Sequence, residues 1–175
     1  MMIENTINKV PDWPLSGLNF KDLTTVLTEP SKFRWTIDQL KNFMLSNKVD
    51  CIAAPGADGF IWGAPVALEL MLPFHMLRKP GQLPPPIVSQ NYEHDHGGLI
   101  VKGDIKVGPG TKVGIIDDVN AGGRTAIASI ELLRQFGVKT HDIYYACVVD
   151  LPFLNGSKKI RETGVTMISL VDYDE

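Results

Sequence analysis

Two adjacent carboxylates, Asp117 and Asp118, stand at the end of a short apolar run in the middle of the chain. A small turn with two glycines follows at residues 120–123, and Thr125 then opens a helical pattern. Backbone N–H groups of such a turn and helix start point at an anion, and the helix dipole favours its negative charge. The carboxylates can accept hydrogen bonds from two neighbouring hydroxyl groups. This stretch, KVGIIDDVNAGGRT, therefore predicts a site for a sugar phosphate.

Each half of this stretch has an ordinary explanation when it is taken alone. A glycine turn before a helix is common, and an acidic pair at a strand end is often only solvated. The order of strand, acidic pair, glycine turn and helix start favours the ligand site, because glycine lets the backbone approach an anion closely.

Composition limits the classes of protein to be considered. The chain has 175 residues with 44% hydrophobic and 21% charged residues, typical of one soluble globular domain, residues 1–175. The net charge is −3 and there is no basic block, so nucleic acid is not an expected partner. Cys51 and Cys147 each lie in an apolar run, so we expect buried unpaired thiols.

No segment has the pattern of a targeting or membrane-spanning sequence. The N-terminus lacks an apolar core flanked by positive charge. The longest apolar stretch, residues 59–74, carries Glu69 and two prolines and is shorter than the roughly 20 residues that a bilayer requires. We therefore expect no membrane association and a cytoplasmic location. The four histidines do not suggest a zinc site.

Apolar runs alternate with helical patterns along most of the chain. This alternation predicts an α/β fold with a mainly parallel sheet flanked by helices, in which ligands bind at the carboxyl ends of the strands. The predicted strands are residues 49–54, 73–79, 142–149 and 165–171, and the predicted helices include 28–48 and 60–72.

Three segments fall outside this alternation. Residues 1–10 read as a short helix or a frayed leader, and the prolines of residues 11–27 predict an extended arm, so that residues 1–34 form an N-terminal arm or hood. The proline-rich residues 80–98 predict a flexible irregular lid. Residues 99–107 alternate in the manner of an exposed strand.

Five ordered blocks resemble the type I phosphoribosyltransferases, and among them the adenine phosphoribosyltransferases. The blocks are PDWPLSGLNFKDLTTVL, GFIWGAPVALEL, LRKPGQLP, VSQNYEHDHG and VGIIDDVNAGGRT, and they cover nearly the full length at matching spacing. The resemblance implies purine salvage, in which adenine displaces pyrophosphate from C1 of phosphoribosyl pyrophosphate to give AMP, with Mg²⁺ and in a homodimer.

The resemblance also assigns roles by position. Asp117 and Asp118 would hold the ribose hydroxyls, and Mg²⁺ indirectly through ribose and pyrophosphate, and Asp95 would be the acid near the purine. The 5′-phosphate would lie on Ala121, Gly122, Gly123, Arg124 and Thr125. The remaining substrate contacts would be Arg78 and Lys79 on pyrophosphate, Asn19, Phe20, Lys21 and Leu154 around the purine, and Tyr92 on the lid.

Several positions depart from the family pattern at the expected site. Asp95 stands where the family has glutamate, and its neighbours His94 and Glu93 are alternative acids, while His96 replaces a family tyrosine. Asp58 stands in place of an arginine, which should weaken a pyrophosphate contact unless magnesium bridges it. Gly122 replaces a threonine and Arg124 a glycine, while Lys21 and Gln82 replace an arginine and a lysine.

These departures leave two alternatives to an adenine enzyme. One is a phosphoribosyltransferase for another base, such as hypoxanthine or guanine. The other is a non-catalytic nucleotide-binding relative that keeps the phosphosugar pocket. The retained acidic pair and the RKPG sequence favour an enzyme, and Asp58 argues most directly against an ordinary one.

Overall fold

A central parallel sheet carries the site. The computed structural model describes residues 3–13, 16, 19–91, 97–102 and 105–174. Within these residues, five parallel strands lie in the order β4 (Phe74–Leu77), β3 (Cys51–Pro55), β7 (Val113–Asn120), β8 (Ile143–Asp150) and β9 (Thr166–Asp172). The predicted mainly parallel α/β sheet is confirmed, and its strand bounds differ from the predictions by a few residues.

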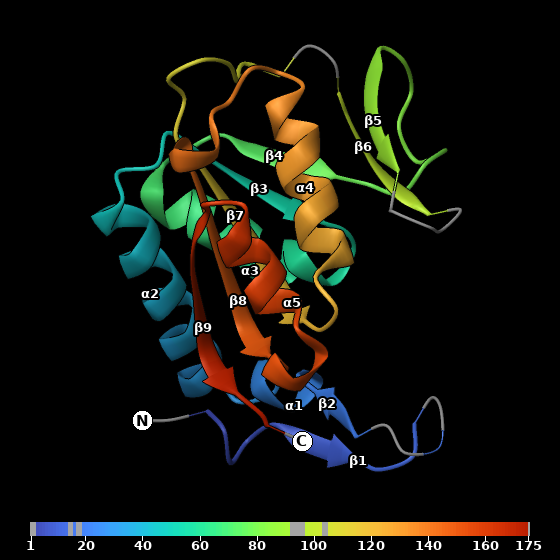
Figure 1. Cartoon of the computed structure of the whole chain (residues 1–175). Coiled ribbons are helices and arrows are strands. Elements are labelled where there is room, and N and C mark those ends of the chain that lie inside the picture. The colour runs from blue at the N-terminus through green and yellow to red at the C-terminus, as the bar shows by residue number, and fades with distance from the viewer. Residues whose placement is uncertain (1–2, 14–15, 17–18, 92–96, 103–104, 175) are drawn as a thin grey trace.

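Helices cover both faces of this sheet (Figure 1). The core on one face includes Leu40 and Met44 of α2 (Pro30–Ser46) and Trp62 of α3 (Asp58–Leu70). The core on the other includes Ile130 of α4 (Arg124–Arg134) and Ile160 of α5 (Gly156–Glu162). Strands covered on both sides read as continuous apolar runs, which is why β3 and β8 could be identified from the sequence. Cys51 and Cys147 are buried and free, as predicted.

The N-terminal residues form more regular structure than predicted. Strands β1 (Asn8–Val10) and β2 (Phe20–Asp22) pair in antiparallel fashion, and α1 (Thr24–Leu27) follows. The prediction of a helix or frayed leader is wrong for Asn8–Val10, because pairing with β2 and the burial of Ile3 and Ile7 fix this segment. The pair lies beyond the carboxyl ends of β8 and β9 (Figure 1).

The proline-rich segment also contains a strand. β5 (Ile87–Asn91) pairs with β6 (Gly98–Lys102), so the prediction of an irregular segment is wrong for residues 87–91. The prediction of a strand over 99–107 is confirmed for residues 99–102, where β6 ends, but the predicted exposure is wrong, because residues 98–101 are buried. The cause is packing against the sheet and α4, because Leu99 and Val101 join the core cluster of that face.

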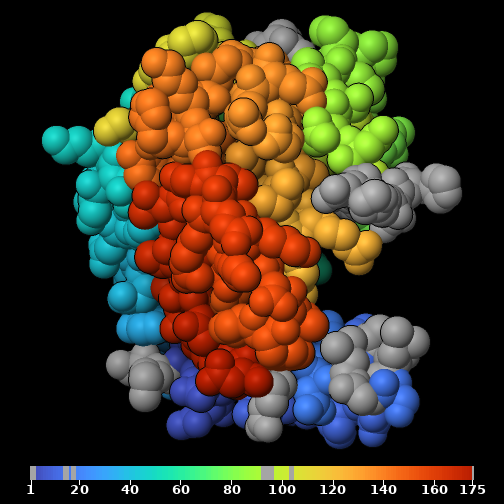
Figure 2. Space-filling view, viewed as in Figure 1, coloured from blue at the N-terminus to red at the C-terminus, as the bar shows by residue number. Residues whose placement is uncertain are grey.

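The β5–β6 hairpin and the N-terminal strands lie at opposite ends of one face. In the space-filling view the hairpin (green) lies against α4, the N-terminal strands (blue) lie at the other end, and the outline is indented between them (Figure 2). Gln135 of the segment after α4 donates hydrogen bonds to Ser89 O at 3.0 Å and Gln90 Oε1 at 2.8 Å, which fixes the hairpin to the body. None of the helices described is long and apolar enough to cross a membrane.

Candidate functional site

Asp117 and Asp118 lie near the carboxyl end of β7, and Asp117 belongs to a buried hydrogen-bond network. Asp117 is only 5% exposed, and its carboxylate accepts hydrogen bonds from the Asp118 backbone N–H at 3.0 Å and from Tyr145 Oη at 3.3 Å. Tyr145 lies on the neighbouring strand β8 and is fully buried. The side chain of Asp117 is therefore held in one orientation, while Asp118 remains half-buried at the cavity wall.

The carboxyl groups of this pair are poorly solvated. Burial raises the pKa of Asp117 well above its usual value, and the charge of Asp118 raises it further. Burial also raises the pKa of Asp118, and the charge of Asp58 contributes in the same direction. Such carboxylates gain most from partners that bring hydrogen-bond donors or positive charge, which are what a ribose and a cation supply.

The turn after β7 is held by a buried side-chain hydrogen bond and by close backbone packing. Asn120 Nδ2 donates a hydrogen bond to Asp150 Oδ1 at 2.7 Å, between two fully buried side chains. Gly123 has φ 79°, a conformation that favours glycine, and it caps the start of α4. Gly156 packs so closely on this turn that a Cβ there would lie 2.7 Å from Gly123 N. The turn and the start of α4 line a cavity, and the N–H groups of a helix start can bind an anion.

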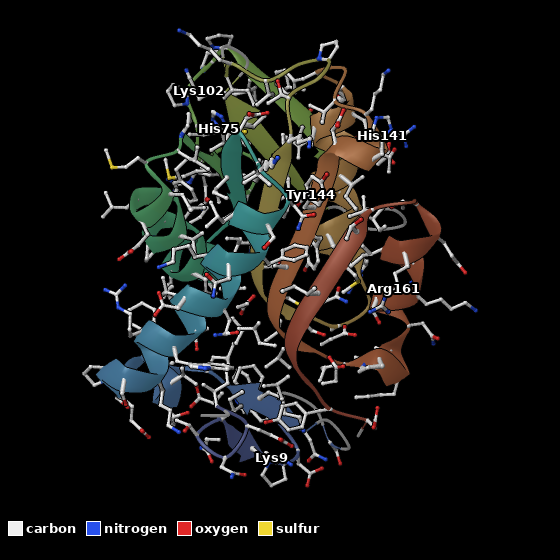
Figure 3. All side chains as sticks on the ribbon, turned by 90° about the vertical axis from the view of Figure 1, so that its left-hand side faces the viewer. Lys9, His75, Lys102, His141, Tyr144 and Arg161 are labelled. Atoms are coloured by element: carbon white, nitrogen blue, oxygen red, sulfur yellow. The ribbon has the colours of Figure 1, made fainter. Side chains whose placement is uncertain are left out.

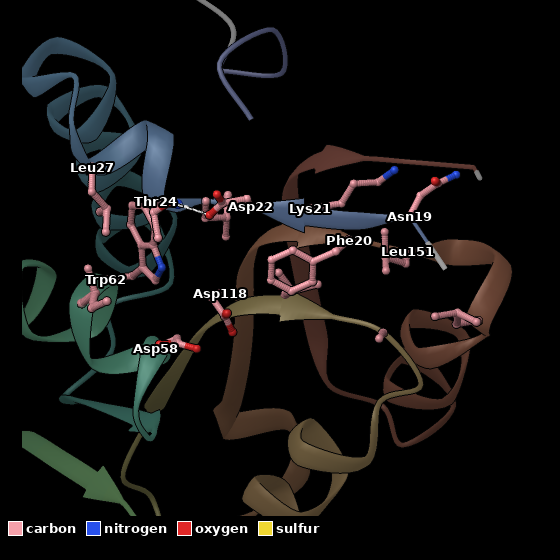
Figure 4. A pocket seen from close by; sticks show the side chains of 15 residues that line it. Asn19, Phe20, Lys21, Asp22, Thr24, Leu27, Asp58, Trp62, Asp118 and Leu151 are labelled. Atoms are coloured by element: carbon pink, nitrogen blue, oxygen red, sulfur yellow. Dashed lines mark hydrogen bonds between the residues drawn. The ribbon is translucent and has the colours of Figure 1, made fainter. Parts of the chain in front are cut away.

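The first of three adjoining cavities lies under β2. It has a volume of about 370 Å³ and is lined mainly by apolar groups of β2, α1, α3 and the loop after β8. Figure 4 shows the Phe20 ring pointing into it, with Asp118 and Asp58 on the side toward β7. An apolar cavity with a few polar groups suits a flat heterocyclic base. Its lining residues are Asn19, Phe20, Lys21, Asp22, Leu23, Thr24, Leu27, Asp58, Ile61, Trp62, Asp118, Val119, Ala121, Leu151 and Leu154.

The other two cavities continue from the first along the acidic pair. One, of about 270 Å³, lies between the turn after β3 and the acidic pair, and includes Asp58, Lys79 and Thr125. The other, of about 160 Å³, lies along residues 119–126, the turn after β7 and the start of α4, called the phosphate turn below after its predicted ligand. Val119 lines all three cavities. A base and a sugar that carries phosphate groups at two positions can therefore occupy the three cavities together.

Most predicted site residues come together in these cavities. Asn19, Phe20, Lys21 and Leu154 line the first, and Lys79 lines the second with the acidic pair. Ala121, Gly122, Gly123, Arg124 and Thr125 line the third. Arg78 is not brought in: it lies near the Phe60 ring, 5.9 Å from the centroid, and donates a hydrogen bond to Gln82 Oε1 at 3.4 Å. Tyr92 and Asp95, with Glu93, His94 and His96, lie outside the described residues.

Several residues of the site were not singled out from the sequence. Trp62, Ile61, Leu27 and Leu151 line the first cavity, but their apolar patterns are equally typical of a core. Tyr145 sits inside a continuous apolar strand, so nothing marks its hydrogen bond to Asp117. Lys159 donates from α5 to Gly122 O at 3.1 Å, a contact between distant parts of the chain. The Asn-Gly pair before α5 is the one local signal that could have identified Gly156.

The donor set fits a magnesium ion that arrives with its substrate. Among the described residues, no group of three or more His, Cys, Asp and Glu side chains could hold a metal by itself. Asp58, Asp117 and Asp118 nevertheless line one cavity. Mg²⁺ is commonly held by one or two carboxylates together with substrate phosphates and water, which this cavity can provide.

Comparison with known proteins extends the similarity over the whole chain. No family model matches the chain. It is 38% identical over 174 residues to the adenine phosphoribosyltransferase of Pectobacterium atrosepticum, a match covering 98% of this chain and 92% of that protein. The crystal structure of the Thermoanaerobacter pseudethanolicus adenine phosphoribosyltransferase is similar with a TM-score of 0.88 at 38% identity, covering 98% of both chains. The Giardia lamblia enzyme, solved with 9-deazaadenine, gives a TM-score of 0.87 at 28% identity, covering 100% of this chain and 99% of that chain.

Proposed function

This chain belongs to the adenine phosphoribosyltransferase family, and we propose that it is a pentosyltransferase of purine salvage that converts adenine and phosphoribosyl pyrophosphate to AMP and pyrophosphate. The observation that carries the proposal is the union of an apolar cavity of about 370 Å³ with two polar cavities along one acidic pair. Adenine, ribose with pyrophosphate, and the 5′-phosphate each have a cavity of fitting chemistry.

The proposed binding mode follows the lining of each cavity. Adenine stacks against Phe20 under β2, with Leu154 on its other side and backbone groups of residues 19–21 at its edge. The ribose hydroxyls donate to Asp117 and Asp118. The 5′-phosphate accepts from the N–H groups of residues 121–125 and from the Thr125 hydroxyl.

The proposed chemistry places charge where these residues can meet it. A ring nitrogen of adenine forms a bond to C1 while the bond from C1 to the pyrophosphate oxygen breaks, and the proton that adenine carried on its ring is released to the leaving pyrophosphate or to water. Positive charge builds on the sugar next to Asp118, and negative charge builds on the leaving group near Lys79. Magnesium, when bound, would stabilise the leaving pyrophosphate. Asp95 would act as the acid near the purine, and residues 80–98 would exclude water.

Asp58 and Arg124 change the charge of this site in opposite directions. Asp58 begins α3 and lines both the base cavity and the pyrophosphate cavity, so it adds negative charge where a pyrophosphate must lie. A bound magnesium ion would offset that repulsion. Arg124 begins α4 and lines the phosphate cavity, where its guanidinium can make a bidentate contact with the 5′-phosphate.

A homodimer completes the proposal. Arg78 lies outside the three cavities of its own chain, which supports its meeting the pyrophosphate in the site of a second copy. We assign the hood, residues 1–34, and the lid, residues 80–98, to the same single domain as the sheet. The cytoplasmic location stays a prediction.

A turnover assay tests the proposal directly. Purified protein is incubated with Mg²⁺ and phosphoribosyl pyrophosphate, and adenine, hypoxanthine, guanine and xanthine are offered in parallel. AMP formed from adenine alone is the expected result. A nucleotide formed from another base would mean that the reaction is the same but the base is different. This is the first alternative, because Asp58 lines the base cavity. No nucleotide from any base, with AMP still bound, would favour a non-catalytic binder.

A further inference from the structure

In strand β2 a charged side chain is buried and an aromatic side chain is exposed, which is the reverse of an ordinary strand. Neighbouring residues of a strand point to opposite sides. Here the lysine side is the buried one: Lys21 is only 4% exposed, whereas Phe20 is 38% exposed. Figure 4 shows the Lys21 side chain pointing away from the base cavity and Phe20 pointing into it. The strand thus buries a charged residue and presents its aromatic residue to the cavity.

A buried lysine needs compensation, and the Tyr173 ring contributes to it. Lys21 Nζ lies 4.5 Å from the centroid of the Tyr173 ring, and Lys9 Nζ lies 4.8 Å from the same centroid. Lys9 and Lys21 are directly opposite each other in the β1–β2 pair. Like charges in that arrangement repel, and the negative face of an aromatic ring attracts cations. The ring therefore stabilises a pairing of the two strands that their lysines oppose.

Tyr173 is itself fixed to the body of the protein. Its side chain is 4% exposed, its Oη donates to Glu4 O at 3.1 Å, and its backbone N–H donates to Asp150 O at 3.1 Å. The Asp150 carboxylate accepts the hydrogen bond from Asn120 at the root of the phosphate turn. A chain of contacts therefore runs from the phosphate turn through Asp150 and Tyr173 to the strand that walls the base cavity.

We propose that Tyr173 is a positioning residue for the base subsite, acting through Lys21 to hold β2 so that Phe20 and the adjoining backbone meet the purine. This inference rests on the proposed function. Tyr173 lines none of the three cavities, and its contact with Asp150 is made by the backbone N–H, which a side-chain substitution keeps, so its side chain acts on the position of β2. It predicts that the affinity for the base depends on Tyr173, while the affinity for phosphoribosyl pyrophosphate does not.

A double-mutant cycle with separate KM values tests this. The variants are Tyr173→Leu, Lys21→Met and their combination, assayed with adenine varied at saturating phosphoribosyl pyrophosphate and then the reverse. A partly buried cation–aromatic contact predicts that each single variant raises the adenine KM by about three- to tenfold. The KM for phosphoribosyl pyrophosphate should change by less than about twofold. The combination should raise the adenine KM by clearly less than the product of the two single effects, because both variants break the Lys21–Tyr173 contact, although Tyr173→Leu also removes the contacts with Lys9 and Glu4 O.

Tyr144→Leu is the matched control. Tyr144 lies in the body of the sheet, away from Lys9 at the N-terminal strands, and contacts Phe43 with ring centroids 6.5 Å apart (Figure 3). It should lower stability without changing the adenine KM. Equal rises in both KM values for Tyr173→Leu, or single effects that multiply in the combination, would overturn the proposal. If Tyr173→Leu does not fold, the adenine KM values of Lys21→Met and Lys21→Arg test the proposal instead. Lys21→Arg keeps the positive charge and should have an adenine KM near wild type, whereas Lys21→Met should have a raised one. Equal adenine KM values in these two variants would overturn the proposal. A wild-type protein without AMP formation would instead count against the proposed function.

Discussion

The phosphate turn and strand β2 line the same site but are held in place by different means. The turn after β7 continues the middle strand of the sheet, and it is fixed by close backbone packing at Gly123, with its positive φ, and at Gly156, together with the buried side-chain hydrogen bond from Asn120 to Asp150. Strand β2 belongs to a two-stranded pair outside the sheet, and side chains such as Tyr173 hold it. We therefore expect substitutions at the turn to lower the affinity for the sugar phosphate strongly, and substitutions around β2 to lower the affinity for the base more mildly.

The largest effect is expected from the acidic pair. Asp117→Asn with Asp118→Asn removes the acceptors of the ribose hydroxyls, and a hydrogen bond to a charged group contributes about 1.5–3 kcal/mol. Affinity for phosphoribosyl pyrophosphate, measured by calorimetry, should fall at least about a hundredfold. Asp38→Asn, which affects only a surface ion pair with Lys41, is the control. Unchanged affinity in the double variant would remove the sugar-site assignment.

The acid on the lid should control turnover rather than binding. Asp95→Ala should lower kcat by about 10²–10⁴-fold, as expected for loss of a general acid. The affinity for phosphoribosyl pyrophosphate should stay nearly constant. Glu93→Ala is the comparison variant: if it lowers kcat and Asp95→Ala does not, the acid is Glu93.

Gly156→Ala sharpens the role of backbone packing behind the turn. The new Cβ would meet the backbone of Ala121 and Gly123, and overpacking of this kind costs about 1–3 kcal/mol. The KM for phosphoribosyl pyrophosphate should rise by about ten- to a hundredfold, with the adenine KM less affected. At Gly108 a Cβ would be 3.7 Å from Phe136 O, an ordinary contact, so Gly108→Ala should leave both KM values near wild type.

A smaller effect is expected at Lys159. Lys159→Ala removes the hydrogen bond to Gly122 O, worth about 0.5–1.5 kcal/mol. The KM for phosphoribosyl pyrophosphate should rise by about two- to tenfold. The neighbouring Lys158 is 72% exposed in its side chain and contacts Glu162 at 4.0 Å, so Lys158→Ala should have no such effect. Identical KM values in the two variants would show that Lys159 does not support the turn.

The acidic pair should also lower stability at neutral pH. Because burial raises the pKa of Asp117 in the folded protein, the folded state keeps its proton to higher pH than the unfolded state. Stability is therefore lost as the pH rises from the usual carboxyl range through the raised pKa. Asp117→Asn removes this loss, so its free energy of unfolding in urea should exceed that of wild type at pH 7 and approach it near pH 4. A variant less stable than wild type at pH 7 would contradict this.

The same contrast explains how far the sequence could predict the molecule. The sheet, its helices and the β7 turn follow from apolar runs, helical periodicity and glycine chemistry, which are local. The strands β1 and β2 have three residues each, too few for periodicity, and the β5 strand lies in a proline-rich segment. Contacts such as Tyr145 with Asp117 and Lys21 with Tyr173 join residues far apart in sequence, so only the folded chain reveals them.

A crystal structure with AMP bound tests the central claim most directly. The account predicts the 5′-phosphate on residues 121–125, the ribose hydroxyls on Asp117 and Asp118, and the purine against Phe20 under β2. A cavity of about 240 Å³ behind the turn, lined by Gln90, Arg124, Glu131 and Lys159 among others, offers a different place. A purine in that cavity, or a phosphate away from the turn, would contradict the assignment of the site.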